Sequence, residues 1–190
     1  MKKVTIVTLL VTAICLFQKA NAQSKMMGEE KSVSVGGAAM YPTKNIIENA
    51  INSKDHTTLV AAVKAAGLVE TLESSGPFTV FAPTNEAFNK LPKGTVETLL
   101  KPENKSTLTQ ILTYHVISGR FDSRELMNRI KEGNGSTELK TVEGGSIWIM
   151  KKGNTLWLKD EKGNLAKITI KDVYQSNGVI HVIDTVIMPK

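Results

Sequence analysis

Residues 146–173 read SIWIMKKGNTLWLKDEKGNLAKITIKDV and contain the triplet Lys-Gly-Asn twice, at 152–154 and 162–164. Apolar and polar residues alternate on both sides of each triplet, which is the pattern of half-buried β-strands. A Gly-Asn pair between two alternating runs is typical of a tight hairpin turn. The stretch therefore predicts consecutive antiparallel strands joined by short turns.

The turns also predict which residues pair across the two hairpins. If residues 153–154 form a two-residue loop, Met150 lies opposite Trp157 in the first hairpin. The same reasoning for the second triplet places Asp160 opposite Lys167, where the two charges would attract each other. These pairs are a test of the register.

Upstream of this region the apolar residues recur at every third or fourth position, which predicts helices in place of strands. Thr84 is well suited to cap a short helix after a strand at 78–82, because its hydroxyl can accept a backbone N–H. Gly67 is expected to end an earlier helix. Helices followed by antiparallel strands make the chain an α+β protein. The expected helices cover residues 43–74 (interrupted at 52–55), 94–100, 104–113 and 122–130.

Residues 1–22 have the features of a bacterial-type signal peptide. They comprise a basic start, an apolar run at 4–17 that is short for a membrane span, and the cleavage triplet Ala-Asn-Ala at 20–22. Residues 23–41 are polar and lack hydrophobic periodicity, so we expect a flexible leader before a single domain at 42–190. The mature chain is then periplasmic, secreted or at the cell surface, and does not span the membrane.

Cleavage after Ala22 would change the composition in two ways that bear on function. The single cysteine, Cys15, leaves with the signal peptide, so the mature chain has no disulfide and no thiol nucleophile. Three lysines leave as well, which lowers the net charge from +6 to +3 and leaves charges of both signs interspersed along the chain. This distribution argues against nucleic acid as a partner.

Three stretches, in order along the chain, resemble the motifs of the fasciclin domain family. The first is TVFAPTNEAF at 79–88, the second is Tyr-His-Val at 114–116, and the third is NGVIHVID at 177–184. Together they make the region 42–190 similar to a fasciclin domain. The residues that carry the resemblance, called the signature residues below, are Thr79, Phe81, Ala82, Pro83, Thr84, Phe88, Tyr114, His115, Asn177, Gly178, His181 and Asp184.

The resemblance implies a wedge-shaped antiparallel β-sandwich flanked by several short helices. It also implies a non-enzymatic adhesion module for a cell surface or an extracellular matrix, without a cofactor, that is monomeric or associates weakly. A single module is expected to bind its partner weakly unless many copies act together. In animal matrix members, an integrin-reading motif precedes the third stretch, and here Asp172 and Val173 keep only its central pair. Both residues are partner-binding candidates, but integrin binding is not implied.

The histidines are the first candidates for catalysis or metal binding. His115 and His181 each lie in an apolar strand, whereas His56 lies in a polar stretch near a helix start and is expected to be solvated. A zinc site needs three or four ligands, and neither His-Glu-x-x-His nor Gly-x-Ser-x-Gly occurs. We therefore predict no catalytic residue and no metal ligand. His115 and His181 are expected to be neutral and hydrogen-bonded within the core, with a metal-binding or base role as the alternative.

The two tryptophans indicate a second candidate function. The predicted register puts Trp148, Met150 and Trp157 on one face of the first hairpin and aliphatic residues on the other. Either neighbouring layers cover both faces, or the tryptophan face is open to a partner. In the open case Trp148 and Trp157 could stack on sugar rings, and the chain would bind a carbohydrate or another small ligand. The expected partner is accordingly a cell-surface or matrix protein or a glycan.

Overall fold

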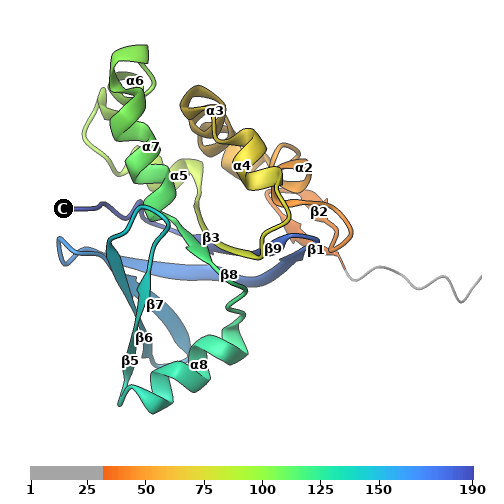
Figure 1. Cartoon of the computed structure of the whole chain (residues 1–190), viewed down its shortest axis with the longest axis vertical. Helices are drawn as coiled ribbons and strands as arrows, with labels where there is room; N and C mark the ends of the chain where they lie inside the picture. The colour runs from red at the N-terminus through yellow and green to blue at the C-terminus, as the bar shows by residue number, and fades with distance from the viewer. Residues whose placement is uncertain (1–31) are drawn as a thin grey trace, which may run out of the picture. The chain divides into compact units, whose positions relative to one another are not determined.

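Seven strands form one continuous hydrogen-bonded sheet in the computed structural model, which describes residues 32–190 (Figure 1). The predicted signal peptide and residues 23–31 of the predicted leader lie outside the described residues. Helices come mainly before the run of strands, so the fold is α+β, as the change of period predicts. In sheet order the strands are β4 (Val116–Ser118), β3 (Phe78–Pro83), β9 (Gly178–Ile183), β8 (Leu165–Gln175), β7 (Thr155–Lys159), β6 (Ser146–Lys152) and β5 (Ser136–Lys140).

One pair of neighbouring strands is parallel, and here the predicted all-antiparallel arrangement is wrong. β3 and β9 run in the same direction, with Phe81 opposite His181. A parallel pair needs a long connection, and the chain between these two strands contains strands β4 to β8. The hairpin turns that predict antiparallel neighbours carry no information about a pair so far apart in sequence.

The expected pair of stacked sheets is a single folded sheet in this structure. β8 has 11 residues with two irregularities between Ile168 and Val173, and it pairs with β7 near its start and with β9 along the rest. The sheet also returns on itself, because Val142, just after β5, donates its N–H to the carbonyl of Val116 in β4 at 2.8 Å. The two ends of the sheet therefore meet, and the sheet is nearly closed.

The helices are short, and a glycine ends one of them. Gly67 follows the last residue of one helix and has a φ of 74°. Glycine adopts this left-handed conformation at little steric cost, so it is suited to end the helix, as predicted. The region predicted as helical over 43–74 contains three α-helices and a 3-10 turn. The helical segments are α2 (Ile46–Ala50), η1 (Lys54–His56), α3 (Thr57–Ala66), α4 (Val69–Glu73), α5 (Asn85–Asn89), α6 (Thr95–Leu99), η2 (Pro102–Asn104), α7 (Lys105–Tyr114) and α8 (Ser123–Glu132).

Two apolar clusters form the interior of the described region. In the first, α2, α3, α4 and α7 pack against β3 and β9, and in the second α8 packs against β5 to β8. Figure 1 shows α3, α4 and α7 on one side of β3 and β8, and α8 on the other side beside β5 and β6. Alternate residues of β3 serve the two clusters, with Val80 and Ala82 in the first and Phe81 in the second. β3 is therefore covered on both faces.

Residues 32–41, the described part of the predicted leader, are not a flexible segment. They form a two-stranded hairpin in which Val35 and Met40 are 1% and 2% exposed. Lys54 donates its N–H to the carbonyl of Gly36 at 3.2 Å and so ties the hairpin turn to the helical region. The prediction was wrong because three-residue strands are too short to show a recognisable alternation. The two strands are β1 (Val33–Val35) and β2 (Ala38–Met40).

The register of the first long hairpin is as predicted, and that of the second is not. Met150 lies opposite Trp157 across β6 and β7. In the next hairpin Trp157, and not Asp160, lies opposite Lys167. The Asp160 carboxylate instead accepts hydrogen bonds from the backbone and side-chain amides of Asn164, at 2.7 and 2.9 Å. This local contact stabilises a loop longer than the two-residue turn that the sequence predicts.

Replacement of Met40 by alanine should lower the free energy of unfolding by about 2–5 kcal/mol, because truncating a buried methionine leaves a cavity. Urea denaturation of a chain of residues 23–190 measures the change. Ser34→Ala is the matched control, because Ser34 lies on the same hairpin and is exposed. Equal stability of Met40→Ala and the wild type would show that the hairpin contributes nothing to the core.

Candidate functional site

The first and third signature stretches lie side by side on the two central strands. Because β3 and β9 pair along their length, Phe81 faces His181, and the two buried rings stack with centroids 5.7 Å apart. About a hundred residues of sequence separate the stretches, so local patterns could not predict this contact. The other apolar signature residues, which are Ala82, Pro83 and Phe88, are also buried.

His181 uses both ring nitrogens inside the protein. Its Nε2–H donates to the carbonyl of Phe121 at 2.8 Å, and its Nδ1 accepts the backbone N–H of Asp172 at 3.3 Å. These contacts require a neutral ring with its proton on Nε2. Burial lowers the pKa of His181, although the Phe121 carbonyl and the Asp172 charge act in the opposite direction. The imidazole is therefore a fixed connector between segments and not a free base.

His115 follows the last residue of α7 and precedes β4, so the prediction that it lies inside a strand is wrong. It has the same arrangement as His181 with the opposite tautomer. Its Nδ1–H donates to the carbonyl of Ile111 at 2.8 Å, and its Nε2 accepts the backbone N–H of Ile187 at 3.2 Å. Burial lowers the pKa of His115 to about 4, against smaller opposing effects of the Ile111 carbonyl and Asp160. The ring fixes the C-terminal segment of the chain against α7.

Tyr114 joins α7 to two parts of the β-rich half. Its hydroxyl donates to the carbonyl of Ser146 at 2.7 Å and accepts the backbone N–H of Glu161 at 3.1 Å. Burial raises the pKa of Tyr114 to about 12, so the hydroxyl stays protonated at neutral pH. Tyr114 and His115 therefore hold different segments although they are neighbours in sequence.

Asn177 and Gly178 hold the helical side of the sheet. The side-chain oxygen of Asn177 accepts the N–H of Ile46 at 3.1 Å, and its amide donates to the carbonyl of Leu72 at 2.7 Å. These contacts fix α2 and α4 at the start of β9. A Cβ atom at Gly178 would collide with the carbonyl of Phe78, so the close approach of β3 requires glycine here.

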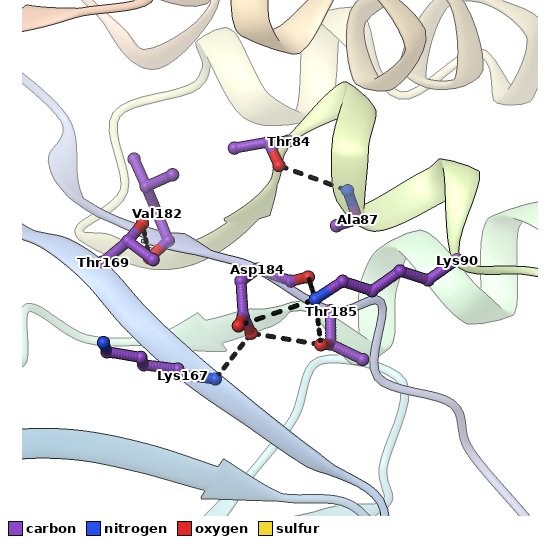
Figure 2. Close-up of polar contacts among 8 residues, drawn as sticks. All are labelled: Thr84, Ala87, Lys90, Lys167, Thr169, Val182, Asp184 and Thr185. Atoms are coloured by element: carbon purple, nitrogen blue, oxygen red, sulfur yellow. Dashed lines mark hydrogen bonds and ion pairs between the residues drawn. The ribbon is translucent and has the colours of Figure 1, made fainter.

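Thr84 and Asp184 act where β3 and β9 end, as Figure 2 shows. The Thr84 hydroxyl accepts the N–H of Ala87 at 3.2 Å and caps α5, as predicted. The Asp184 carboxylate accepts the backbone N–H of Lys167 at 2.9 Å and lies 3.6 Å from the Lys90 ammonium group. Asp184 therefore connects the end of β9 to β8 and to the residue that follows α5.

The segment 119–123, which leads from β4 into α8, is held from three sides. The Thr79 hydroxyl accepts the N–H of Phe121 at 2.8 Å, and the His181 Nε2–H donates to the carbonyl of Phe121 at 2.8 Å. The third contact comes from the Asp172 carboxylate, which accepts the backbone N–H of Ser123 at 2.6 Å and also its hydroxyl. The position of α8 therefore depends on side chains from β3, β8 and β9.

Asp172 and Val173 are not a surface pair that a partner could contact. Val173 is 0% exposed, and both carboxylate oxygens of Asp172 are engaged by Ser123. Asp172 also has a φ of 60°, a left-handed conformation that aspartate tolerates better than most residues, at the irregular part of β8. The structure therefore removes Val173 from the partner-binding candidates and assigns the Asp172 carboxylate to the start of α8.

The expectation that His56 is solvated is wrong, because the side chain is 2% exposed. Its Nδ1 lies 2.9 Å from the Ser53 hydroxyl, and its Nε2 has no hydrogen-bond partner. Burial lowers the pKa of His56 more than the nearby Ala82 carbonyl raises it. His56 and His115 both line an apolar cavity of about 50 Å³ between the helices and β3. The polar sequence around His56 gave no signal of this burial.

The two tryptophans lie on the outer face of the β6–β7 hairpin and are half-buried. The opposite face, with Ile147 and Ile149, is fully buried in the second cluster. A lysine ammonium group lies over each indole ring, Lys159 over Trp148 at 5.1 Å and Lys152 over Trp157 at 5.3 Å. Of the two alternatives, a hairpin covered on both sides and an open tryptophan face, the structure favours the open face. We call this surface the tryptophan face.

Neither a metal-binding group of side chains nor a membrane-spanning helix is found among the described residues. Within residues 32–190, no three His, Asp or Glu side chains come together in a way that could hold a metal ion. In the same part of the chain, no helix is both long enough and apolar enough to cross a membrane. The polar signature residues are engaged in holding segments of the backbone together.

Comparison with known proteins identifies the family. The fasciclin domain model matches residues 54–189, which include all three signature stretches. The chain therefore belongs to the fasciclin domain family, as the resemblance of the three stretches predicts.

Several known proteins resemble this chain in sequence or in fold. Protein sll1483 of Synechocystis is 45% identical over 181 residues, which are 94% of this chain and 92% of that protein. Immunogenic protein MPB70 of Mycobacterium bovis is 37% identical over 161 residues, which are 82% of this chain and 73% of that protein. A domain pair from the insect cell adhesion molecule Fasciclin I has the same fold, with a TM-score of 0.68 and 17% identity, covering 82% of this chain and 57% of the solved chain.

The stability of the protein should decrease as the pH falls from about 6.5 toward 4. The unfolded chain binds a proton at His115 near pH 6.5, whereas the folded chain binds it only near pH 4. The contribution is complete above pH 6.5 and is lost below it, by about 2 kcal/mol between pH 7.5 and pH 5 for His115 alone. Burial of His181 and His56 acts in the same direction.

Urea denaturation at about pH 7.5 and pH 5 measures this loss. His115→Asn should be less stable at both pH values and should show a smaller difference between them. An unfolding free energy that is the same at both pH values in the wild type would contradict the assignment of neutral, buried imidazoles.

Replacement of Asp172 by alanine should destabilise the protein by about 2–3 kcal/mol, because it removes both acceptors of Ser123 at the start of α8. Asp172→Asn should cost less, because asparagine keeps an acceptor oxygen and also tolerates the left-handed conformation. Thermal unfolding of both variants gives the comparison. Wild-type stability of Asp172→Ala would show that the carboxylate does not anchor the helix.

Proposed function

We propose that this chain is an exported, non-enzymatic module that makes adhesive contact with a cell surface or an extracellular matrix. Support comes from its membership of the fasciclin domain family and from the adhesive role that the resemblance implies. The proposal includes removal of residues 1–22, so that the mature chain acts in the periplasm, at the cell surface or in the medium.

The observation that carries the proposal is the internal use of the polar signature residues. His115 and His181 each have both ring nitrogens hydrogen-bonded, and the Tyr114 hydroxyl contacts two backbone groups. A general base or nucleophile must have a free atom for its substrate, and these side chains have none. The residues that would be candidates for catalysis therefore maintain the fold, and a partner would bind at the surface of the protein.

The tryptophan face supports a second candidate, which is the binding of a carbohydrate. Trp148 and Trp157 are half-buried on the side of the hairpin that faces away from the second cluster. An indole ring offers a flat apolar surface for a sugar ring and is also a frequent anchor at protein interfaces. The tryptophan face is thus the proposed contact surface for either kind of partner.

A module of this size is expected to act weakly as a single copy. We propose that it is a monomer or self-associates weakly, and that adhesion arises when many copies are displayed together. Linked copies convert later binding events into intramolecular ones, which raises the overall affinity without new contacts.

Beads coated densely with the mature chain should retain cells of the producing organism, or its isolated matrix, during washing. Trp148→Ala/Trp157→Ala beads should lose most of this retention, since loss of a central aromatic anchor costs about 2 kcal/mol or more of binding. Beads coated with the wild-type chain at low density should retain few cells, because the effect depends on many copies.

Ile51→Ala is the matched control, because Ile51 is 53% exposed and lies in the helical half, away from the hairpin. Circular dichroism checks that each variant is folded. Absence of retention by wild-type beads at every density would contradict the adhesive function. Equal retention by wild-type and tryptophan-variant beads would keep adhesion but would remove the tryptophan face as its surface.

A further inference from the structure

A basic cleft lies where β7 separates from β8. The two strands pair as far as Trp157 and Lys167, and beyond this pair β8 turns away to pair with β9. The opening that results measures about 530 Å³, and none of the described residues that line it is acidic. Its polar lining consists of Lys151, Lys167, Lys171, Asn154, Thr155 and Thr169.

The basic cleft adjoins the tryptophan face at Lys167, whereas Lys151 and Leu156 lie opposite each other on the α8 side of the hairpin. Lys167 lies directly opposite Trp157 on the neighbouring strand, so the two side chains share one face of the sheet. Figure 2 shows that the backbone N–H of Lys167 contacts Asp184 while its side chain extends away from that carboxylate. Lys152 and Lys159, which lie over the two indole rings, extend the positive charge across the tryptophan face.

The lysines of this surface are not held in ion pairs within the described part of the chain. No ion pair with a carboxylate forms, among residues 32–190, at any of the five lysines of the cleft and the tryptophan face. Glu138, which lies opposite Trp148 on β5, is instead 3.7 Å from the Lys140 ammonium group and accepts a hydrogen bond from Ser146. The five lysines are Lys151, Lys152, Lys159, Lys167 and Lys171.

We propose that the basic cleft and the tryptophan face together bind an acidic polysaccharide. Lysine ammonium groups would pair with its carboxylate or sulfate groups, and the Trp148 and Trp157 rings would lie against its sugar rings. The inference deepens the second candidate of the proposed function and rests on it. The ligand is then defined by its negative charge as well as by its sugar rings.

The lysines over the indole rings do not prevent this binding. Lys152 is exposed, and an exposed contact between an ammonium group and an aromatic ring is weak. When a sugar ring takes the place of the Lys152 or Lys159 ammonium group, that group stays within reach of an acidic substituent on the same sugar. Trp148 and Trp157 also occupy diagonal positions on neighbouring strands, with Cα atoms roughly 7–8 Å apart, so one oligosaccharide can contact both rings.

Two other classes of polyanion fit the surface less well. Arginine is the side chain favoured for bidentate recognition of phosphate, and the described lining of the cleft contains lysine but no arginine. An acidic peptide would satisfy the ammonium groups, but its carboxylate side chains present no ring to the two indoles. The observations therefore favour a glycan over nucleic acid or protein.

Tryptophan fluorescence gives a direct test, because Trp148 and Trp157 are the only tryptophans in the chain. The mature chain is titrated with an oligosaccharide of uronic acids at about 50 mM NaCl, and with a neutral dextran of similar length. The uronate should change the emission in a saturable way, and the dextran should not. Raising NaCl to about 500 mM should weaken uronate binding, because the attraction between charges is screened.

The variant Lys151→Gln/Lys167→Gln/Lys171→Gln keeps both tryptophans and should bind the uronate at least about tenfold more weakly. Lys93→Gln/Lys101→Gln/Lys105→Gln is the matched control, because it removes the same charge from exposed lysines near α6 and α7. The control variant should bind like the wild type. Circular dichroism shows whether either variant has lost its fold.

Any of four results would overturn the inference: no emission change with uronate, an equal response to dextran, equal affinity in both triple variants, or an equally strong response to single-stranded DNA or polyglutamate. The bead assay separates this inference from the proposed function. If beads retain cells through the tryptophan face but the chain does not bind uronate, the adhesive function stands and the acidic glycan is excluded as its ligand. Uronate binding without cell retention would support the acidic glycan as a ligand and contradict the adhesive function.

Discussion

The parallel pairing of β3 with β9 is the constraint on which the rest of the structure depends. Both faces of β3 are buried, and side chains in or next to the two strands reach outward to hold the peripheral segments. Thr79 and His181 hold the connection before α8, Asn177 holds α2 and α4, and Asp184 holds β8. The signature stretches of the family are therefore the places where separate segments are tied to one central pair of strands.

Local features of the fold could be predicted because local patterns encode them. The alternation around residues 153–154 predicts the first hairpin and its register, and Thr84 predicts the start of α5. His115 and His181 were expected to be buried, neutral and hydrogen-bonded, because they lie in apolar runs. Their hydrogen-bond partners could not be predicted, since the carbonyls and N–H groups that they contact belong to segments brought near only by folding.

The features that sequence reasoning missed depend on contacts between distant segments. Asp160 looks like half of a charge pair but binds Asn164, and Ser53 and His56 are buried although their neighbours in sequence are polar and exposed. The basic cleft is a further case. Charges of both signs alternate along the chain, yet the separation of β7 from β8 gathers lysines of β6 and β8 with no acid among them. The modest net charge of +6 for the whole sequence conceals this asymmetry.

The near-closure of the sheet has a consequence for display at high density. An open sheet edge offers unpaired backbone groups to a strand of another molecule, and such pairing leads to fibres. Here Val142 already occupies the carbonyl of Val116 at one end, and β5 at the other end carries the charged side chains of Glu138 and Lys140. Both features oppose strand-to-strand joining between copies, which is what the dense display in the proposed function would require.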